Sequence, residues 1–234
     1  MQTLWNNFIY NPIYNSLIFI AQNITLQDVG LAVVVLTIII RLIMFPLSKK
    51  SILSQYKMKA LEPKIKAIKD QNLSKEAEAT ATFALYKEEK MNPFSGCLYL
   101  LVQLPILFAL YFVFIKGVHQ PDHLYSFFNT DGLKNNFLGL IDITKPFIPL
   151  AILAGITQAI QAFLAPKPAT NGGKGFQEQF ASSMSAQTKY VLPIIIIFIA
   201  SKLAAAVALY WVISNTFSIG QELYIKKKFS HLRV

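Results

Sequence analysis

Charged residues and cysteine are scarce in this sequence. Only 15% of its 234 residues are charged, whereas 54% are hydrophobic; soluble domains carry about 25% charged residues. This composition is typical of a membrane protein. The single cysteine, Cys97, excludes an internal disulfide bond and a thiolate metal cluster.

Basic residues are missing from the first part of the chain. Residues 1–28 contain no Lys or Arg, and a secretory signal needs a basic region ahead of its apolar core, so we expect no cleaved signal. Pro12, Asn15 and Ser16 interrupt the longest apolar piece, which is too short to cross a hydrocarbon core of about 30 Å. We expect an interfacial helix over residues 1–27, capped by Asn11. Its apolar residues at helical spacing are Ile13, Leu17, Ile20 and Ile24.

Long apolar runs follow. A spanning helix needs roughly 20 apolar residues, and four segments and one shorter piece suit this role. The last apolar block is too long for one span, and Ser201-Lys202 divides it. The predicted fold is an all-α integral membrane protein whose caps include Asp28 and Asn92. Its five spans cover residues 29–47, 93–115, 146–164, 190–200 and 203–225.

The basic residues are distributed unevenly between the predicted loops. Segment 48–92 carries ten lysines, and loop 165–189 and the basic tail 226–234 add seven further Lys or Arg. The opposite side has only Lys116, Lys134, Lys145 and Lys202. The positive-inside rule therefore places the N-terminus outside and the C-terminus in the cytoplasm. This asymmetry accounts for most of the net charge of +10 and predicts no specific nucleic-acid partner.

Segment 48–92 is rich in Lys, Glu and Ala. Pro63 and Ser74 are typical helix starts, so we expect a cytoplasmic helical hairpin. A solvated charged linker is the alternative.

One arginine, Arg41, interrupts the apolar run of the first span. Thr37 lies four residues earlier and shares its helix face. Other spans contribute uncharged polar residues at the same predicted depth, namely Gln103, Thr157, Gln158, Gln161, Ser214, Asn215 and Ser218. Two alternatives are that Arg41 reaches for the lipid headgroups and that the polar residues only join helices.

Carboxylates are missing from the interior of the predicted spans, so the sequence offers Arg41 no buried ion pair. A desolvated guanidinium without compensation is very costly. We therefore infer a hydrophilic cavity open to the cytoplasm, with Arg41 as its fixed charge. The outer halves, such as LAVVVL and FALYFVFI, are too apolar to extend the cavity, so it is expected to be a dead-ended groove.

The motifs IIIRLIMFPLSKK, MKALEPKIKAIK, LYKEEKMNPFSGCLYLLVQLPILFALY and VALYWVISNTFSIGQELYI occur in order along the chain. This arrangement resembles the compact five-span form of the YidC membrane-protein insertases, relatives of the mitochondrial and thylakoid insertases. The resemblance implies a multi-pass protein of a bacterial plasma membrane that inserts small membrane proteins without ATP, alone or beside the Sec translocon. Newly made membrane proteins and lipid are the implied partners, and the ribosome is a further candidate.

The resemblance also implies positions for the groove. Arg41 and Thr37 match the family's first-span groove residues, and Gln103 matches the glutamine before Leu-Pro. Gln161 and Trp211 match a late third-span glutamine and an aromatic of the fifth span. We add Gln158, one turn before Gln161, and Asn215 from the polar layer.

Three other functions fit the sequence less well. A proton-coupled transporter needs a titratable residue within a span, and an intramembrane hydrolase needs a base beside a nucleophile; His119, His123 and His231 all lie outside the spans. His119 and His123 flank Pro121 in a loop, so we expect exposed side chains and no metal site. We expect no enzyme activity, no catalytic residue and no cofactor. A structural membrane subunit remains an alternative, and it predicts that Arg41 contacts a partner protein.

Overall fold

The computed structural model describes residues 2–71, 73–89, 95–118, 120–165 and 186–228, with the backbone alone at residues 2, 75 and 95–102. These residues are mostly helical, as predicted. The proposed cap Asn92, most of the loop 165–189, His119 and the tail beyond Lys228 lie outside the described residues.

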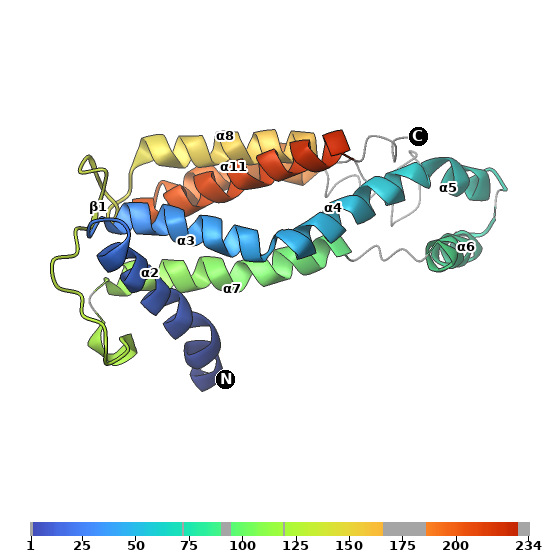
Figure 1. Cartoon of the computed structure of the whole chain (residues 1–234). Coiled ribbons are helices and arrows are strands. Elements are labelled where there is room, and N and C mark those ends of the chain that lie inside the picture. Colours follow the sequence, from blue (N-terminus) through green and yellow to red (C-terminus); the bar gives the residue numbers. More distant parts are fainter. Residues whose placement is uncertain (1, 72, 90–94, 119, 166–185, 229–234) are drawn as a thin grey trace.

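The centre of the molecule is a bundle of long helices (Figure 1). Helix α11 packs against both α3 and α8, and α10 packs against the other side of α8. The helix starts follow the predicted spans closely, because each long apolar run begins where its helix begins. The bundle helices are α3 (Val29–Ile43), α7 (Ser95–Lys116), α8 (Ile148–Leu164), α10 (Leu192–Ala200) and α11 (Ala205–Lys228).

The first predicted span, 29–47, is not one continuous helix. Helix α3 stops at Ile43, and after Met44 the chain continues as α4 (Phe45–Ala60), bent by 60° from α3. Pro46 lies in the first turn of α4, where its missing N–H and its ring interrupt the helical hydrogen bonds of the preceding turn. Lys49 and Lys50 therefore extend from a helix and not from a loop.

The N-terminal segment is helical from Gln2, through α1 (Gln2–Trp5), the π-helical turn η1 (Asn6–Tyr10) and α2 (Asn11–Asn23). The predicted cap at Asn11 is wrong, since the residue before it is already helical and no side-chain cap forms. Leu17 and Ile20 are buried as expected, but Ile24 is exposed because the helix ends before it.

Hydrogen bonds attach this N-terminal helix to the loop after α7. Tyr14 Oη donates to the carbonyl of Val118 at 2.8 Å, and Tyr10 Oη donates to Gln120 Oε1 at 2.7 Å. His123 is half-buried, because its ring packs against Tyr10 and its Nδ1 lies 2.9 Å from Asn11 Oδ1. The expected exposure of His123 is therefore corrected.

The loop between α7 and α8 closes this end of the bundle. It holds η2 (Pro121–His123) and a two-stranded antiparallel hairpin, β1 (Asn136–Phe137) and β2 (Ile141–Asp142). Asp28 caps α3 as predicted, its Oδ1 accepting from the Leu31 N–H at 2.8 Å. The loop also supplies carbonyls to the first N–H groups of α3 and α11, so the two helices start at the same end.

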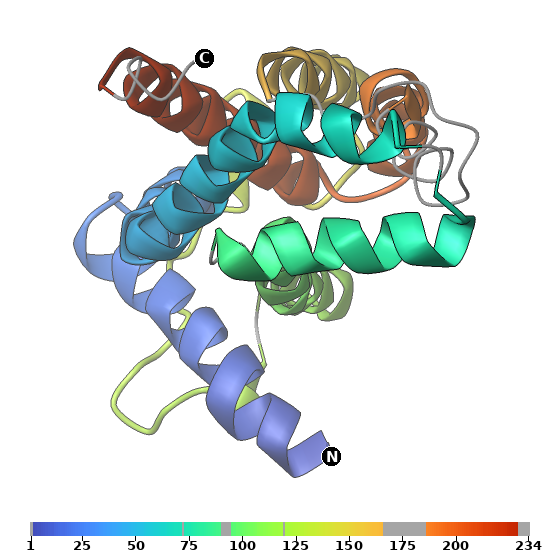
Figure 2. The same cartoon turned by 90° about the vertical axis from the view of Figure 1, so that its right-hand side faces the viewer.

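The other end carries α4, α5 (Glu62–Lys69) and α6 (Lys75–Glu88). Figure 2 looks onto this end, where α5 and α6 lie across the bundle axis. Pro63 lies in the first turn of α5, and Ser74 caps α6, as the sequence predicted. An ion pair between Lys64 and Glu89 joins the two ends of the hairpin.

Among the described residues, no single helix has both the length and the hydropathy of a membrane span. The bent pair formed by α3 and α4 meets that test when its two helices are taken together.

Candidate functional site

The buried side chains of three helices change from apolar to polar at one level of the bundle. On α3 the change comes between Leu36 and Thr37, and on α11 between Val212 and Ser214. On α8 it comes between Gly155 and Thr157. Ala162 and Ile225 are the exceptions beyond this level. The end near β1 therefore has an apolar core, which we call the outer half, and the remainder, the inner half, has a mainly polar interior.

In the inner half of α3, the polar residues lie on the buried face and the apolar residues lie on the exposed face. Arg41 is only 6% exposed and Thr37 is fully buried, whereas Leu42 and Ile43 are 57% and 72% exposed. Helices of soluble proteins place their apolar face inside and their charged face in water. The inner half of α3 has the reverse arrangement, so its apolar face suits lipid and its polar face suits the interior.

Arg41 faces α11, where it interacts electrostatically with the buried Tyr210. Thr37, one turn earlier, donates from Oγ1 to the carbonyl of Val33 at 2.6 Å and so satisfies its own hydroxyl within the helix. The structure thus brings the predicted pair Thr37 and Arg41 onto the buried face and adds Tyr210, which sequence reasoning missed.

Asn215 connects α11 to α8. Its Nδ2 donates to Thr157 Oγ1 at 3.3 Å and lies 3.4 Å from the carbonyl of Ala154. Thr157 in turn donates to its own helix, to the carbonyls of Leu153 and Ala154. Two of the polar residues expected to share a layer are therefore in direct contact.

Several buried polar atoms near the boundary between the two halves or within the inner half lack a hydrogen bond within the described part of the chain. They include Gln103 Oε1 on α7, and the hydroxyls of Tyr210 and Ser214, which approach each other without the geometry of a hydrogen bond. Buried polar groups are nearly always hydrogen-bonded. These atoms can therefore accept or donate to water or to a polar ligand.

A carboxylate also lies in this half. Glu222, three residues before the end of the predicted span 203–225, is 6% exposed and accepts a hydrogen bond from Tyr56 Oη of α4 at 2.7 Å. The adjacent Gln221 donates to Ser48 Oγ, also on α4. The expectation that no acidic side chain lies inside the spans is corrected, since Glu222 falls within the predicted span 203–225 and α4 covers it there.

The other predicted site residues are less enclosed. Gln103, Gln158 and Gln161 are each partly exposed. Trp211 is also partly exposed and packs against the apolar core of the outer half. Its neighbour Tyr210 is buried and interacts electrostatically with Arg41.

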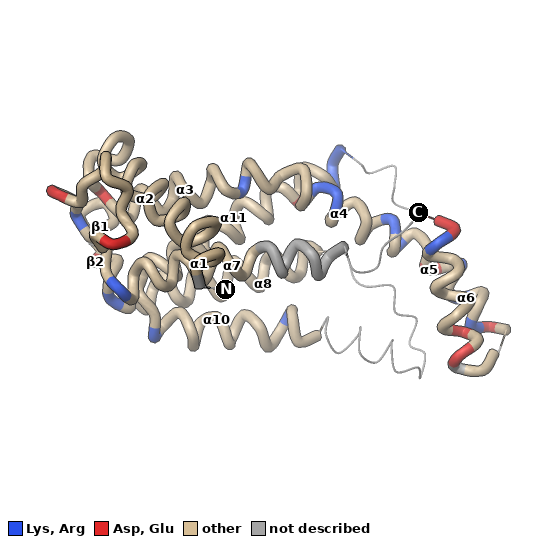
Figure 3. Tube along the Cα trace, turned by 90° about the horizontal axis from the view of Figure 1, so that it is seen from below, with Lys and Arg blue, Asp and Glu red and all other residues tan. Residues whose placement is uncertain are grey.

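Charge is distributed unevenly along the molecule. Figure 3 shows Lys and Arg concentrated at the end that carries α4, α5 and α6, with fewer near β1 and β2. The polar interior lies between this basic end and the apolar outer half. Its only described arginine is Arg41, so a ligand that enters from the basic end would meet a positive charge inside the bundle.

Comparisons with known proteins show which family the sequence resembles. The residue pattern that defines the 60Kd inner membrane protein family matches residues 19–231. The chain is 37% identical over 225 residues to the membrane protein insertase YidC of Ectopseudomonas mendocina (strain ymp), an alignment that covers 92% of this chain and 35% of that protein. It is 36% identical over 228 residues to the membrane protein insertase YidC of Stutzerimonas stutzeri (strain A1501), which covers 96% of this chain and 36% of that protein.

The chain thus spans about a third of the length of these relatives. The family match extends over both halves of the bundle and over the hairpin of α5 and α6. This chain belongs to the 60Kd inner membrane protein family, that of the YidC insertases, and is a multi-pass protein of the bacterial inner membrane.

Proposed function

We propose that this chain inserts small membrane proteins into the bilayer through a hydrophilic groove that opens to the cytoplasm and to lipid. The observation that carries the proposal is the reversal on α3, where Arg41 is buried and the apolar residues beside it are exposed. The insertase names of the relatives support the same role.

The proposed topology has five spans in a single insertase core over residues 1–234, with the N-terminus outside and the C-terminus in the cytoplasm. The start of α3, the loop with Lys134 and Lys145, and the start of α11 are held at one end by backbone hydrogen bonds. The lysine-rich α4 and α5 lie at the other. The positive-inside rule assigns the lysine-rich end to the cytoplasm.

Arg41 supplies the fixed charge that attracts a substrate. A guanidinium stays protonated and binds a carboxylate through two parallel hydrogen bonds. An acidic or polar segment that must cross the bilayer would enter the inner half, pair with Arg41, and then have only the apolar outer half left to cross. The proposed groove residues that assist are Thr37, Gln103, Gln158, Gln161, Trp211 and Asn215.

Lipid supplies the driving free energy. The exposed faces of α3 and α8 carry large apolar side chains, including Ile39, Leu42, Ile152 and Ile156. A substrate helix can slide along such a surface into the bilayer, and burial of its apolar area contributes about 25 cal/mol per Å². No nucleotide is needed for this step. The hairpin of α5 and α6 is proposed to meet the substrate first, with the Sec translocon and the ribosome as candidate partners.

Reconstitution tests the proposal. The purified protein is placed in lipid vesicles, and a short single-span protein with an acidic translocated tail is added from outside. Protection of the tail from protease measures insertion. We expect protection with the wild-type protein and with Arg41→Lys, and little protection with empty vesicles or with Arg41→Ala.

Two outcomes would count against the proposal. Equal protection in empty and in loaded vesicles would remove the insertase role. Equal protection by wild type and Arg41→Ala, for acidic and neutral tails alike, would leave the insertase role but remove the electrostatic part. Binding of Arg41 to a stable partner protein, without any insertion, would favour a structural subunit instead.

A further inference from the structure

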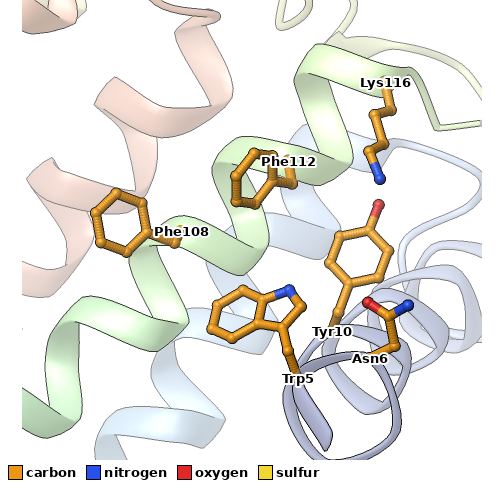
Figure 4. Close-up of a pocket in the computed structure, with 6 residues that line it drawn as sticks. All are labelled: Trp5, Asn6, Tyr10, Phe108, Phe112 and Lys116. Atoms are coloured by element: carbon orange, nitrogen blue, oxygen red, sulfur yellow. The ribbon is translucent and has the colours of Figure 1, made fainter. Parts of the chain in front are cut away.

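A cavity lies away from the polar interior, between the N-terminal helix and α7. It has a volume of about 530 Å³ and is lined by Trp5, Asn6, Tyr10, Phe108, Phe112 and Lys116 (Figure 4). Sequence reasoning placed Trp5 and Tyr10 on an interfacial helix but gave them no ligand. The insertase mechanism uses none of these residues.

The two walls of the cavity follow from helix geometry. Phe108, Phe112 and Lys116 are spaced by four residues, so they lie on one face of α7. On the other wall, η1 is a π-helical turn, in which the Asn11 N–H bonds to the carbonyl of Asn6. This wider turn brings Trp5 and Tyr10 onto the same side, facing α7. Single π-turns are often found at functional sites.

Aromatic contacts fix the shape of the cavity. The rings of Trp5 and Phe112 meet edge to face with centroids 6.5 Å apart. Tyr10 is buried, while Phe108 and Phe112 are 48% and 37% exposed on the outside of the bundle. The cavity is therefore open toward the surface that faces lipid.

The polar groups lie at one end. Lys116, the last residue of α7, extends its Nζ over the Tyr10 ring, 5.4 Å from the centroid. Asn6 adds an amide from the opposite wall, η1. Phe108 lies two turns deeper along α7, about 12 Å from Lys116 at 1.5 Å per residue. From the Lys116 end toward Phe108, the cavity therefore offers a cation and an amide first and then aromatic rings.

We propose that this cavity binds an anionic phospholipid of the membrane, with the phosphate at Lys116 and Asn6 and the upper acyl chain against Phe112 and Phe108. A phospholipid has the same order of groups along its length, a charged headgroup above an apolar chain. Trp and Tyr residues favour this depth of a bilayer, and a lysine at the end of a helix reaches the headgroups. The bound lipid would hold the N-terminal helix against α7. The proposal is independent of the insertase function.

Fluorescence of Trp5 measures the binding. The Trp211→Phe variant leaves Trp5 as the only tryptophan. It is reconstituted in phosphatidylcholine vesicles that also contain a lipid brominated on its acyl chains. This brominated lipid is phosphatidylglycerol in one series and phosphatidylcholine in the other. We expect the brominated phosphatidylglycerol to reach half-maximal quenching at about fivefold lower mole fraction, since a lysine near the membrane surface favours an anionic lipid by about this factor.

Lysine variants identify the contact. Lys116→Gln is expected to remove the preference for phosphatidylglycerol, and Lys116→Arg to keep it. Lys202→Gln is the matched control, because Lys202 is an exposed lysine at the same end of the bundle and outside the cavity. Its preference should equal that of the parent protein.

Three results would overturn the proposal. The first is equal quenching by the two lipids in the parent protein, which requires no lysine variant. The second is an unchanged preference in Lys116→Gln. The third is loss of the preference on addition of soluble glycerol phosphate, which would identify a site for free phosphate esters and not for lipid.

Discussion

The outer and inner halves of the bundle are made from the same helices, but the buried side chains are apolar in the outer half and mainly polar in the inner half. In the outer half, small and branched apolar residues such as Ala32, Val33 and Ala208 are fully buried. In the inner half, Thr37, Arg41 and Asn215 take the corresponding positions. The exposed face of α8 is apolar along both, from Ile148 to Phe163. The difference shows that the outer half contributes stability through packing, whereas the inner half maintains a polar environment within a lipid-facing exterior.

The largest expected effect on stability lies in the outer half. Leu110 of α7 is 1% exposed within the apolar core. Leu110→Ala should lower the free energy of unfolding by about 2–4 kcal/mol, because it removes buried methyl groups and leaves a cavity. Denaturant titration in detergent measures this loss. A loss below that of Asn215→Ala would break the assignment of stability to the outer half.

The second effect is on activity, and it lies in the inner half. Arg41→Ala should reduce insertion of acidic-tailed substrates about tenfold or more, since a hydrogen bond to a charged group contributes about 1.5–3 kcal/mol. Neutral-tailed substrates should be affected far less. Protease protection in vesicles gives both rates, and Arg41→Lys is the matched control that keeps the charge. A uniform loss for all tails would indicate a packing defect.

The third effect concerns the outer end. Asp28 accepts hydrogen bonds from the N–H groups of Leu31 and Leu138, at 2.8 and 2.7 Å. Asp28→Ala removes the cap of α3 and one anchor of the β1 loop, and it should cost about 1–2 kcal/mol of stability. Asp28→Asn keeps an acceptor and should cost less. Equal melting temperatures for wild type and Asp28→Ala would show that the loop is held by its backbone alone.

The smallest expected effect is at the junction of α8 and α11. Asn215→Ala breaks the hydrogen bond to Thr157, and interhelical hydrogen bonds of this kind contribute about 0.6 kcal/mol in membranes. Unfolding in detergent should therefore change little. A double-mutant cycle with Thr157→Val isolates the pair, and a coupling above about 2 kcal/mol would show that the polar layer is a main source of stability.

The sequence was sufficient to predict the helices and the buried face of Arg41. Apolar run length determines where the spans lie, and the four-residue spacing of Thr37 and Arg41 places both on one face. The caps at Asp28 and Ser74 were predicted because their side chains act on adjacent backbone. These features depend on neighbours in the chain, which a sequence shows directly.

The missed features depend on contacts between distant segments. The bend after Ile43 turns α4 over the end of α11, so that Tyr56 meets Glu222, 166 residues later in the sequence. The proximity of Tyr210 to Arg41 depends on the rotation of α11, which its packing against α3 and α8 sets. The five-residue turn at Asn6 has no sequence signature that we recognise.

Labelling of one engineered cysteine tests most directly whether the inner half is open to cytoplasmic water. Replacement of Cys97 by Ser leaves a protein without cysteine. In this background Gln158→Cys is compared with Ile156→Cys. Ile156 is two residues away on the lipid-facing side of α8 and is 49% exposed. A membrane-impermeant maleimide is added to inside-out vesicles. The account predicts rapid labelling at position 158 and almost none at position 156. Equal protection of both positions would contradict it.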